Sequence, residues 1–421
     1  IYQVKNMDKP QAFLEITSSS IRLLIGYALN GAPIVLYTKE KKIPNLLNED
    51  RSVNKDVLNA ALADFHSIRD NEEKLDITIS HINLVLPSSG LKVFQNEKTT
   101  NVVDSNNEIN RIDLSNLTSL ITKEPLPENY TIVDTIPDEF ILENGERYSN
   151  PPLGKISSSL TEKAKIYALP NGVVTFYKEN ANLSGYRVIK SEPSCFCASS
   201  LIATNNNMPK TYVLVDIGGS ITSVSFVGEG SPYSNASFFI GGDDLTRYIQ
   251  KEFCISKDEA INLKHRYGYD DRAKSYSLPL INGMDASNSK VKYYQKDLNE
   301  LISIFIKDYF VTLDNAIASL LSTYNGHYDN APIILIGGGS KLAGLESFFA
   351  NHYQNKEIIR YSPNAIGARE PNFVSLLGLI LIVSQYKGTL EDNHRGMPDV
   401  SRVNKKEKAR KSKESYDDDS L

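Results

Sequence analysis

Cysteine is scarce in this 421-residue chain, and its placement excludes two common uses. Cys195, Cys197 and Cys254 do not have the paired spacing of a metal-ligand set. The segment 195–197 (CFC) predicts two thiols on one face of a strand, with no second pair elsewhere. We therefore expect buried free thiols in a reducing cytoplasm rather than disulfides or a metal centre.

Long apolar runs and an excess of basic charge are also missing. No stretch of about 18 apolar residues occurs, so we expect no membrane span, and no signal-peptide pattern is present. The net charge of −5 gives no reason to expect nucleic acid binding. A chain of 421 residues is too long for one hydrophobic core and favours two or more domains.

A strand–turn–strand pattern at residues 213–227 places one carboxylate, Asp216, beside a glycine turn. The first strand is apolar on both faces, which predicts a buried position in a sheet. Gly218 and Gly219, followed by Ser220, allow backbone N–H groups to point at an anion. A phosphate fits there, with Asp216 holding a hydrated magnesium ion. An ordinary β-hairpin would also explain these glycines.

The same pattern occurs earlier in the chain, and a third glycine loop follows later. Residues 13–26 repeat the apolar strand, acidic residue, small-residue turn and apolar strand, with Glu15 as the acid, which indicates an internal duplication. Residues 332–345 combine an apolar strand, the loop 337–340 (GGGS) and a helix, where a nucleoside can lie against the backbone. Together the three loops favour a nucleotide site.

In order and spacing, these loops resemble the superfamily of actin, heat-shock chaperones and sugar kinases. Within it the chain is similar to FtsA, the actin-like family of bacterial cell division, from about residue 13 to 385. The likeness also rests on residues 192–194 (EPS), 241–246 (GGDDLT), 259–268 (EAINLKHRYG) and 373–379 (FVSLLGL).

The resemblance implies an α/β, actin-like two-domain ATPase fold with a small inserted α+β subdomain of the FtsA type. It predicts subdomain IA at 10–86 and 163–205 with 376–390, the inserted subdomain IC at 87–162, subdomain IIA at 206–245 and 326–375, and subdomain IIB at 246–325. Residues 1–9 are expected to be an expression remnant or disordered, and residues 391–421 a disordered charged tail.

Hydrophobic periodicity and capping signals place several elements. Amphipathic helices are expected within residues 53–68 and 106–121, and a long one within 290–324. Ser256 and Glu259 form a capping box for a helix that ends near Gly268. The polar stretch 270–289 is interpreted as a loop, either functional or mobile.

By resemblance, Glu15 and Asp216 hold Mg²⁺ and act with Glu192 in catalysis. Glu192 would orient an attacking water. A structural role as a carboxylate at the start of a helix would explain Glu192 equally well. Lys264 would reach the ribose or base of ATP. The full set implied for ATP is Thr17, Ser18, Ser19, Ser20, Gly218, Gly219, Ser220, Gly241, Gly242, Lys264, Gly337, Gly338, Gly339 and Ser340.

Several residues depart from the family pattern in ways that weaken hydrolysis. The family's first loop is Asp-Ile-Gly-Thr-Ser, but here Glu15 replaces the aspartate and Thr17 the glycine. Glutamate is one methylene longer than aspartate, so it shifts the position of a metal-bound water. Threonine in the turn disfavours a positive φ angle. Ile261 replaces an acid that contacts the ribose, and residues 303–305 (SIF) replace Glu-Pro-Arg. We expect ATP binding with weak or absent ATPase activity.

The function implied by the resemblance is a cytoplasmic scaffold, peripheral to the inner face of the membrane at the division site. It would bind ATP, self-associate into filaments, meet other division proteins and tether FtsZ by its C-terminal peptide. That peptide would dock on subdomain IIB, where charge is offered by Lys264, Arg266, Arg272 and Lys307. Ordinary solvation explains each of these four charges as well.

Other functions remain open from the sequence. A pilus-assembly relative carries a similar insertion, and a small-molecule kinase or phosphatase shares the superfamily, although no unassigned acidic motif supplies a kinase base.

The basic run 405–413 (KKEKARKSK) has no apolar stripe, so a membrane-anchor helix is not visible. Weak electrostatic membrane contact or a solvated charge run explains it.

Overall fold

The structure, a computed structural model, describes residues 9–385 apart from 44–45, 47, 49–52, 71–74, 271–278, 285–288 and 325. The expectations for the tail at 391–421 and for the first eight residues lie outside the described residues, as does Arg272.

The first apolar hairpin forms the centre of a five-stranded sheet. Its side chains are buried because both faces of the sheet are covered. The strand order is β11-β6-β1-β2-β3, with β1, β2 and β3 antiparallel and β1, β6 and β11 parallel. The strands are β1 (Gln11–Ile16), β2 (Ser20–Leu29), β3 (Ala32–Lys42), β6 (His81–Leu86) and β11 (Arg187–Pro193).

The second apolar hairpin forms the centre of another five-stranded sheet with the same plan. Its order is β14-β13-β12-β17-β18, again with three antiparallel strands followed by parallel additions. The strands are β12 (Thr211–Ile217), β13 (Thr222–Gly228), β14 (Ser231–Phe238), β17 (Ile333–Ile336) and β18 (Ile358–Arg360). The shared order and strand directions confirm the internal duplication.

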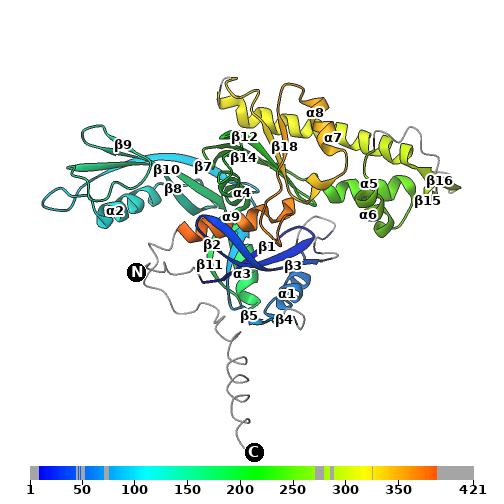
Figure 1. The fold of residues 1–421 in the computed structure, drawn as a ribbon, viewed down its shortest axis with the longest axis horizontal. Coiled ribbons are helices and arrows are strands. Elements are labelled where there is room, and N and C mark those ends of the chain that lie inside the picture. The colour runs from blue at the N-terminus through cyan, green and yellow to red at the C-terminus, as the bar shows by residue number, and fades with distance from the viewer. Residues whose placement is uncertain are drawn as a thin grey trace, which may run out of the picture.

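An inserted unit extends from the first sheet toward the left of Figure 1. Four antiparallel strands in the order β7-β10-β8-β9 carry helix α2 on one face, around a small core of their own. The elements are β7 (Lys92–Asn101), α2 (Arg111–Thr122), β8 (Tyr130–Leu142), β9 (Arg147–Tyr148) and β10 (Ser159–Pro170). Because β10 pairs along its length with β7 and β8, the insertion continues past the boundary expected at residue 162.

Two buried helices, α4 (Ser194–Ile202) and α9 (Val374–Gln385), pack against each other in the larger core. A Cβ atom on Gly378 would lie 1.7 Å from the carbonyl oxygen of Cys197, so only glycine allows this crossing. The prediction that Cys195 and Cys197 lie on a strand is wrong, since both belong to α4. Both are buried free thiols, whereas Cys254 is exposed.

The helical subdomain at the right of Figure 1 follows the second sheet. Its elements are α5 (Gly242–Phe253), α6 (Lys257–Arg266), the hairpin β15 (Pro279–Met284) and β16 (Lys290–Tyr294), and α7 (Gln295–Leu321). The capping box at Ser256 and the long helix are confirmed. The loop expected across 270–289 is corrected at Pro279–Met284, which forms β15 and pairs with β16.

Short elements complete the described chain: α1 (Lys55–Ala63), β4 (Ser67–Asp70), β5 (Leu75–Thr78), α3 (Asn171–Leu183), η2 (Ser322–Tyr324), η3 (Gly338–Lys341), α8 (Leu345–His352) and η4 (Pro371–Phe373). Over the residues that the structure describes, every helix is too short or too polar to cross a membrane.

Candidate functional site

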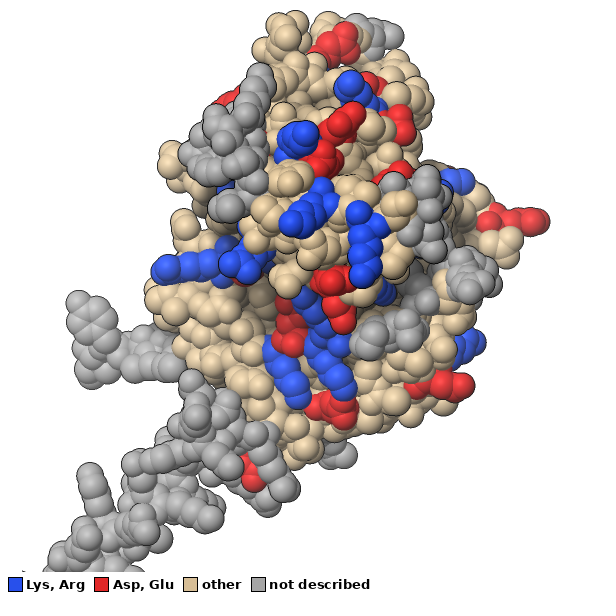
Figure 2. All heavy atoms as spheres, turned by 90° about the vertical axis from the view of Figure 1, so that its right-hand side faces the viewer, with Lys and Arg blue, Asp and Glu red and all other residues tan. Residues whose placement is uncertain are grey.

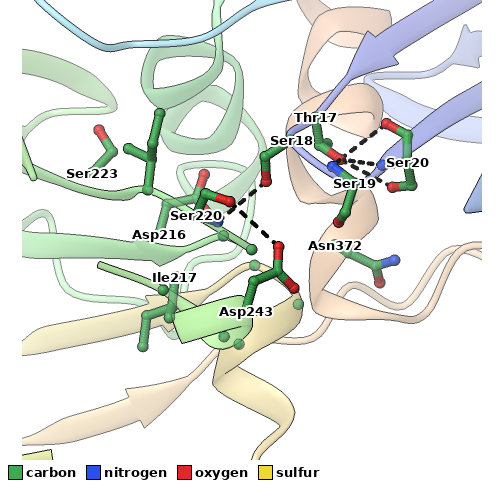
Figure 3. Close-up of a pocket in the computed structure, with 18 of the residues that line it drawn as sticks. Thr17, Ser18, Ser19, Ser20, Asp216, Ile217, Ser220, Ser223, Asp243 and Asn372 are labelled. Carbon is green, nitrogen blue, oxygen red and sulfur yellow. Dashed lines mark hydrogen bonds between the residues drawn. The ribbon is translucent and has the colours of Figure 1, made fainter. Parts of the chain in front are cut away.

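A cleft of about 740 Å³ lies where the turns of the two duplicated hairpins face each other. The β1–β2 turn forms one wall and the β12–β13 turn the other, while η3 and η4 contribute a third side (Figure 3). The sequence-predicted residues that line it are Glu15, Thr17, Ser18, Ser19, Ser20, Asp216, Gly218, Gly219, Ser220, Gly241, Gly242, Lys264, Gly337, Gly338 and Gly339.

The first turn is held by Thr17. Its hydroxyl oxygen accepts the N–H of Ser20 at 3.0 Å and the N–H of Ser19 at 3.4 Å. Its own N–H donates to the carbonyl of Ser20 at 2.9 Å. The hydroxyl therefore uses two backbone donors that a glycine at this position would leave available to an anion.

The second turn is held by the start of α5. The N–H of Gly242 donates to the carbonyl of Gly218 at 3.0 Å, and that of Asp243 donates to Gly219 at 2.7 Å. A Cβ atom on Gly241 would lie 2.4 Å from the Gly219 oxygen. Gly241 and Gly242, expected to contact ATP, thus also support the turn from behind.

The two turns meet across the cleft. Ser18 points toward Ser220 in Figure 3, and the N–H of Ser220 donates to the Ser18 hydroxyl at 3.2 Å. A Cβ atom on Gly219 would lie 2.8 Å from that hydroxyl and 2.5 Å from a carboxylate oxygen of Asp243. This narrow part of the cleft has room for the bare backbone of a glycine and no larger residue.

Glu15 is paired with an arginine that lies directly opposite it on β2. Arg22 Nη1 lies 2.9 Å from Glu15 Oε2, and Arg22 Nε lies 2.8 Å from Glu40 Oε1 on β3. Arg22 Nη1 also donates to the carbonyl of Asn372 at 3.2 Å. Burial raises the pKa of Glu15, and the Arg22 guanidinium offsets part of that rise.

Asp216 ends β12 against the third loop. A Cβ atom on Gly337 would lie 2.3 Å from Asp216 Oδ1, and Gly337 has a φ of +82°, so both space and backbone require glycine. Burial raises the pKa of Asp216 to about 7, with the Glu15 charge adding to the rise and Arg22 opposing it. Near neutral pH this carboxyl is therefore only partly ionised.

The remainder of the third loop has two different environments. Gly338 has open space around its Cα atom, as a surface for a flat ligand requires. Ser340, in contrast, is fully buried and its hydroxyl donates to the carbonyl of Gly337 at 2.7 Å. Ser340 therefore shapes the loop and does not line the cleft.

Lys264 enters the cleft from α6. Its ammonium donates to the carbonyl of Gly242 at 2.7 Å and to the hydroxyl of Thr246 at 2.6 Å. Burial lowers the pKa of Lys264 to about 8; the Asp243 carboxylate opposes this change and Lys42 adds to it. The lysine thus closes the α5–α6 corner beside the second turn.

Glu192 is the sequence-predicted catalytic residue that the structure does not bring to the cleft. Its side chain is fully buried, with Lys190 Nζ 2.7 Å from Glu192 Oε1 and 3.2 Å from Asp134 Oδ2. Burial raises the pKa of Glu192 well above its ordinary value, and Asp134 adds to the rise. Glu192 is absent from the cleft lining and lies just before α4, as the alternative interpretation of a carboxylate at a helix start implies.

The cleft residues that the sequence analysis did not identify as site residues include Arg22, Glu40, Asp243 and Asn372. Asp243 lies in the quoted segment 241–246, but its place beside Gly219 depends on α5 packing under the second turn. Arg22 carried one signal, its position in the hairpin opposite Glu15, which predicts a cross-strand ion pair.

The residues expected to bind a partner do not form one set. Lys264 is directed into the cleft, whereas Arg266 and Lys307 are exposed. Figure 2 views the molecule from the side of α5, α6 and the β15–β16 hairpin, and shows Lys and Arg side chains interspersed with Asp and Glu. Positive charge on this face is therefore local, and the face as a whole carries charges of both signs.

Glu15 and Asp216 are the two acids expected to hold a magnesium ion. Magnesium is usually held through one or two ionised carboxylates and the phosphates of its ligand. Here the Arg22 guanidinium holds the Glu15 carboxylate at 2.9 Å. Within the described residues, no three His, Cys, Asp or Glu side chains gather as a metal site. Glu15, as arranged, does not fit the ion.

The duplicated sheets and the cleft between their turns define an actin-like protein. Among solved structures, the fold is similar to the PilM–PilN type IV pilus biogenesis complex, with a TM-score of 0.56 and 17% identity, covering 89% of this chain and 98% of that chain. It is also similar to MreB5 of Spiroplasma citri bound to AMPPNP, with a TM-score of 0.51 and 12% identity, covering 92% and 98%. The expected fold class is confirmed.

Sequence comparison narrows the class. Residues 213–378 match the family model for cell division protein FtsA. The chain is 23% identical over 387 residues to cell division protein FtsA of Staphylococcus epidermidis, covering 87% of this chain and 77% of the relative. It is 25% identical over 386 residues to that of Streptococcus pneumoniae, covering 90% and 80%. The resemblance to the FtsA family is confirmed.

Proposed function

We propose that this chain is an actin-like scaffold of cell division that binds ATP between its two duplicated turns. The observation that carries the proposal is the meeting of Ser18 and Ser220 across a cleft of about 740 Å³, in a chain that resembles FtsA along most of its length. The phosphates would lie at these turns, and the nucleoside along the open backbone at Gly338.

The proposed contacts with FtsZ and with other copies of the chain rest on the same resemblance to FtsA. FtsZ would bind through its C-terminal peptide at the helical subdomain, and copies of the chain would associate through the insertion. The insertion supports self-association because exposed apolar side chains gather on its adjoining segments, where a surface of this kind usually marks a contact. They are Val103, Ile112, Leu153 and Ile156.

The proposed place of action is the inner face of the cell membrane at the division site. This part of the proposal rests on the relatives named cell division protein FtsA. A pilus-assembly function draws support only from the fold, which proteins of different function share. A small-molecule kinase would need a substrate base in the cleft, but the Asp243 carboxylate there is placed against the second turn.

We expect ATP to raise the melting temperature of the full chain. A ligand bound only by the folded state stabilises it by about 3 kcal/mol when present at about 100 times its Kd. Gly219→Val should abolish the shift, because its side chain would fill the space beside Ser18 and Asp243. Thermal unfolding with and without ATP measures both.

Gly172→Val is the matched control, since a Cβ atom on Gly172 meets nothing within 4 Å. This variant should keep the full ATP shift. If ATP leaves the melting temperature of the wild type unchanged, in magnesium and in its absence, the nucleotide-binding proposal is wrong.

A further inference from the structure

Arg22 is a largely buried cationic side chain in the cleft lining. It projects from β2 between two acids in register, Glu15 on β1 and Glu40 on β3. The ion pairs measure 2.9 Å and 2.8 Å, and the side chains of Arg22 and Glu15 are each only 12% exposed. The guanidinium is thus fixed by contacts on both sides, and it lines the cleft beside the first turn.

The Arg22 guanidinium also has N–H groups that its protein partners do not use. Three of its five N–H groups are used, by Glu40, Glu15 and the carbonyl of Asn372. Over the described residues, the two N–H groups of Nη2 have no hydrogen-bond partner. Each of these two N–H groups can donate to a phosphate oxygen, and an arginine stays charged at any physiological pH.

We propose that Arg22 takes the place of the divalent cation, so that this chain binds the polyphosphate of ATP or ADP without magnesium. The inference rests on the nucleotide binding proposed above. A hydrated magnesium ion would need the Glu15 carboxylate that Arg22 holds, and breaking a buried pair of this kind is costly. The arginine therefore supplies positive charge and at the same time withholds the metal ligand.

The charges around the site agree with this assignment. Besides Glu15 and Glu40, the cleft lining holds the acids Asp216 and Asp243. Without a cation, these carboxylates would repel a phosphate chain. Arg22 is the positive group that two ion pairs hold between Glu15 and Glu40; the cleft lining also contains Lys42, Lys264 and Lys341.

The test is titration of the full chain with a fluorescent ATP analogue, once in excess EDTA and once in excess Mg²⁺. The wild type should give Kd values within about threefold of each other. Arg22→Gln should weaken binding in EDTA by about 10- to 100-fold, as expected for loss of charge-assisted hydrogen bonds. Mg²⁺ should restore much of that loss, because Glu15 is then released.

Two variants keep the experiment decisive. Arg360→Gln removes an exposed arginine paired with Glu346 at 3.3 Å and should leave both Kd values unchanged. If Arg22→Gln does not fold, the double variant Glu15→Gln, Arg22→Gln removes both charges of the buried pair, and it should lose EDTA-resistant binding.

Each result has one meaning. Wild-type binding that needs Mg²⁺ overturns the inference and leaves the proposed nucleotide site intact. Binding that resists EDTA in the wild type and equally in Arg22→Gln shows that Arg22 only neutralises Glu15. Absence of binding under both conditions overturns the proposed function itself.

Discussion

At the scale of single residues, the first turn combines two departures that the structure explains together. Thr17 uses the N–H groups of Ser19 and Ser20 through its hydroxyl, and Glu15 is held by Arg22. The turn therefore presents fewer donors and less free carboxylate than a glycine loop with a shorter acid would. These two changes should lower the rate of ATP hydrolysis more than the affinity for ATP, because hydrolysis also needs an attacking water held in one position.

We expect ATP turnover by the wild type well below about one per second, slow for an enzyme. Glu15→Asp combined with Thr17→Gly should raise the rate, because it frees two backbone donors and shortens the acid. Thr17→Ser, which keeps the hydroxyl contacts, should change the rate little. Phosphate release measures all three. A rapid wild-type ATPase that disappears in Asp216→Ala would instead favour a kinase.

The sequence identified the cleft residues whose chemistry is local and missed those that depend on distant pairing. Ser18, Ser220 and Gly338 follow from their own turns. Arg22 does not, because its partners come from β3 and from the carbonyl of Asn372, 350 residues away in the chain. Glu192 lies outside the cleft lining, and its position just before α4 agrees with the alternative interpretation as a carboxylate at a helix start.

At the scale of elements, prediction failed where a segment is apolar on every side. The segment 194–202 is buried almost throughout, so its periodicity cannot separate helix from strand, and it forms α4. Capping chemistry was more informative. The Ser256–Glu259 box fixed the start of α6 because its hydrogen bonds form within one turn.

One buried acid in the insertion gives an element-scale prediction. Glu162 on β10 is 4% exposed, and burial raises its pKa to about 7 from 4.5. Lys98, opposite in register, is instead paired with Glu124 at 2.8 Å. Because the folded-state pKa is the higher one, ionisation costs no stability below about pH 4.5; the cost grows between about pH 4.5 and 7 and changes little above that.

Glu162→Gln should therefore stabilise the chain by about 1–3 kcal/mol at about pH 8, after allowance for solvent screening, and by little at about pH 5. Urea unfolding at the two pH values measures the difference. Glu97→Gln changes an exposed acid on the neighbouring strand and should show no such dependence on pH. Equal effects of Glu162→Gln at both values would contradict the burial argument.

At the scale of the whole molecule, two copies of one sheet plan place their hairpin turns face to face, with α4 and α9 packed in the larger core. The duplication was visible in the sequence because each copy keeps its own apolar strands and turn. The extent of the insertion was not, since β10 stays paired in the four-stranded sheet as far as Pro170 while Tyr167 and Leu169 pack in the large core, without a break in the sequence pattern.

The partner surface gives the last prediction. Arg266 on α6 and Lys307 on α7 are exposed, and an acidic FtsZ tail would be attracted to both. Arg266→Glu with Lys307→Glu should weaken binding of a labelled FtsZ tail peptide by about tenfold or more at low salt, and moderate salt should weaken wild-type binding because it screens exposed charge. Arg111→Glu with Lys123→Glu makes the same charge change on the insertion and should leave the affinity near that of the wild type. No binding by the wild type would remove the FtsZ assignment and leave the fold intact, whereas equal binding by both double variants would move the docking site off the helical subdomain.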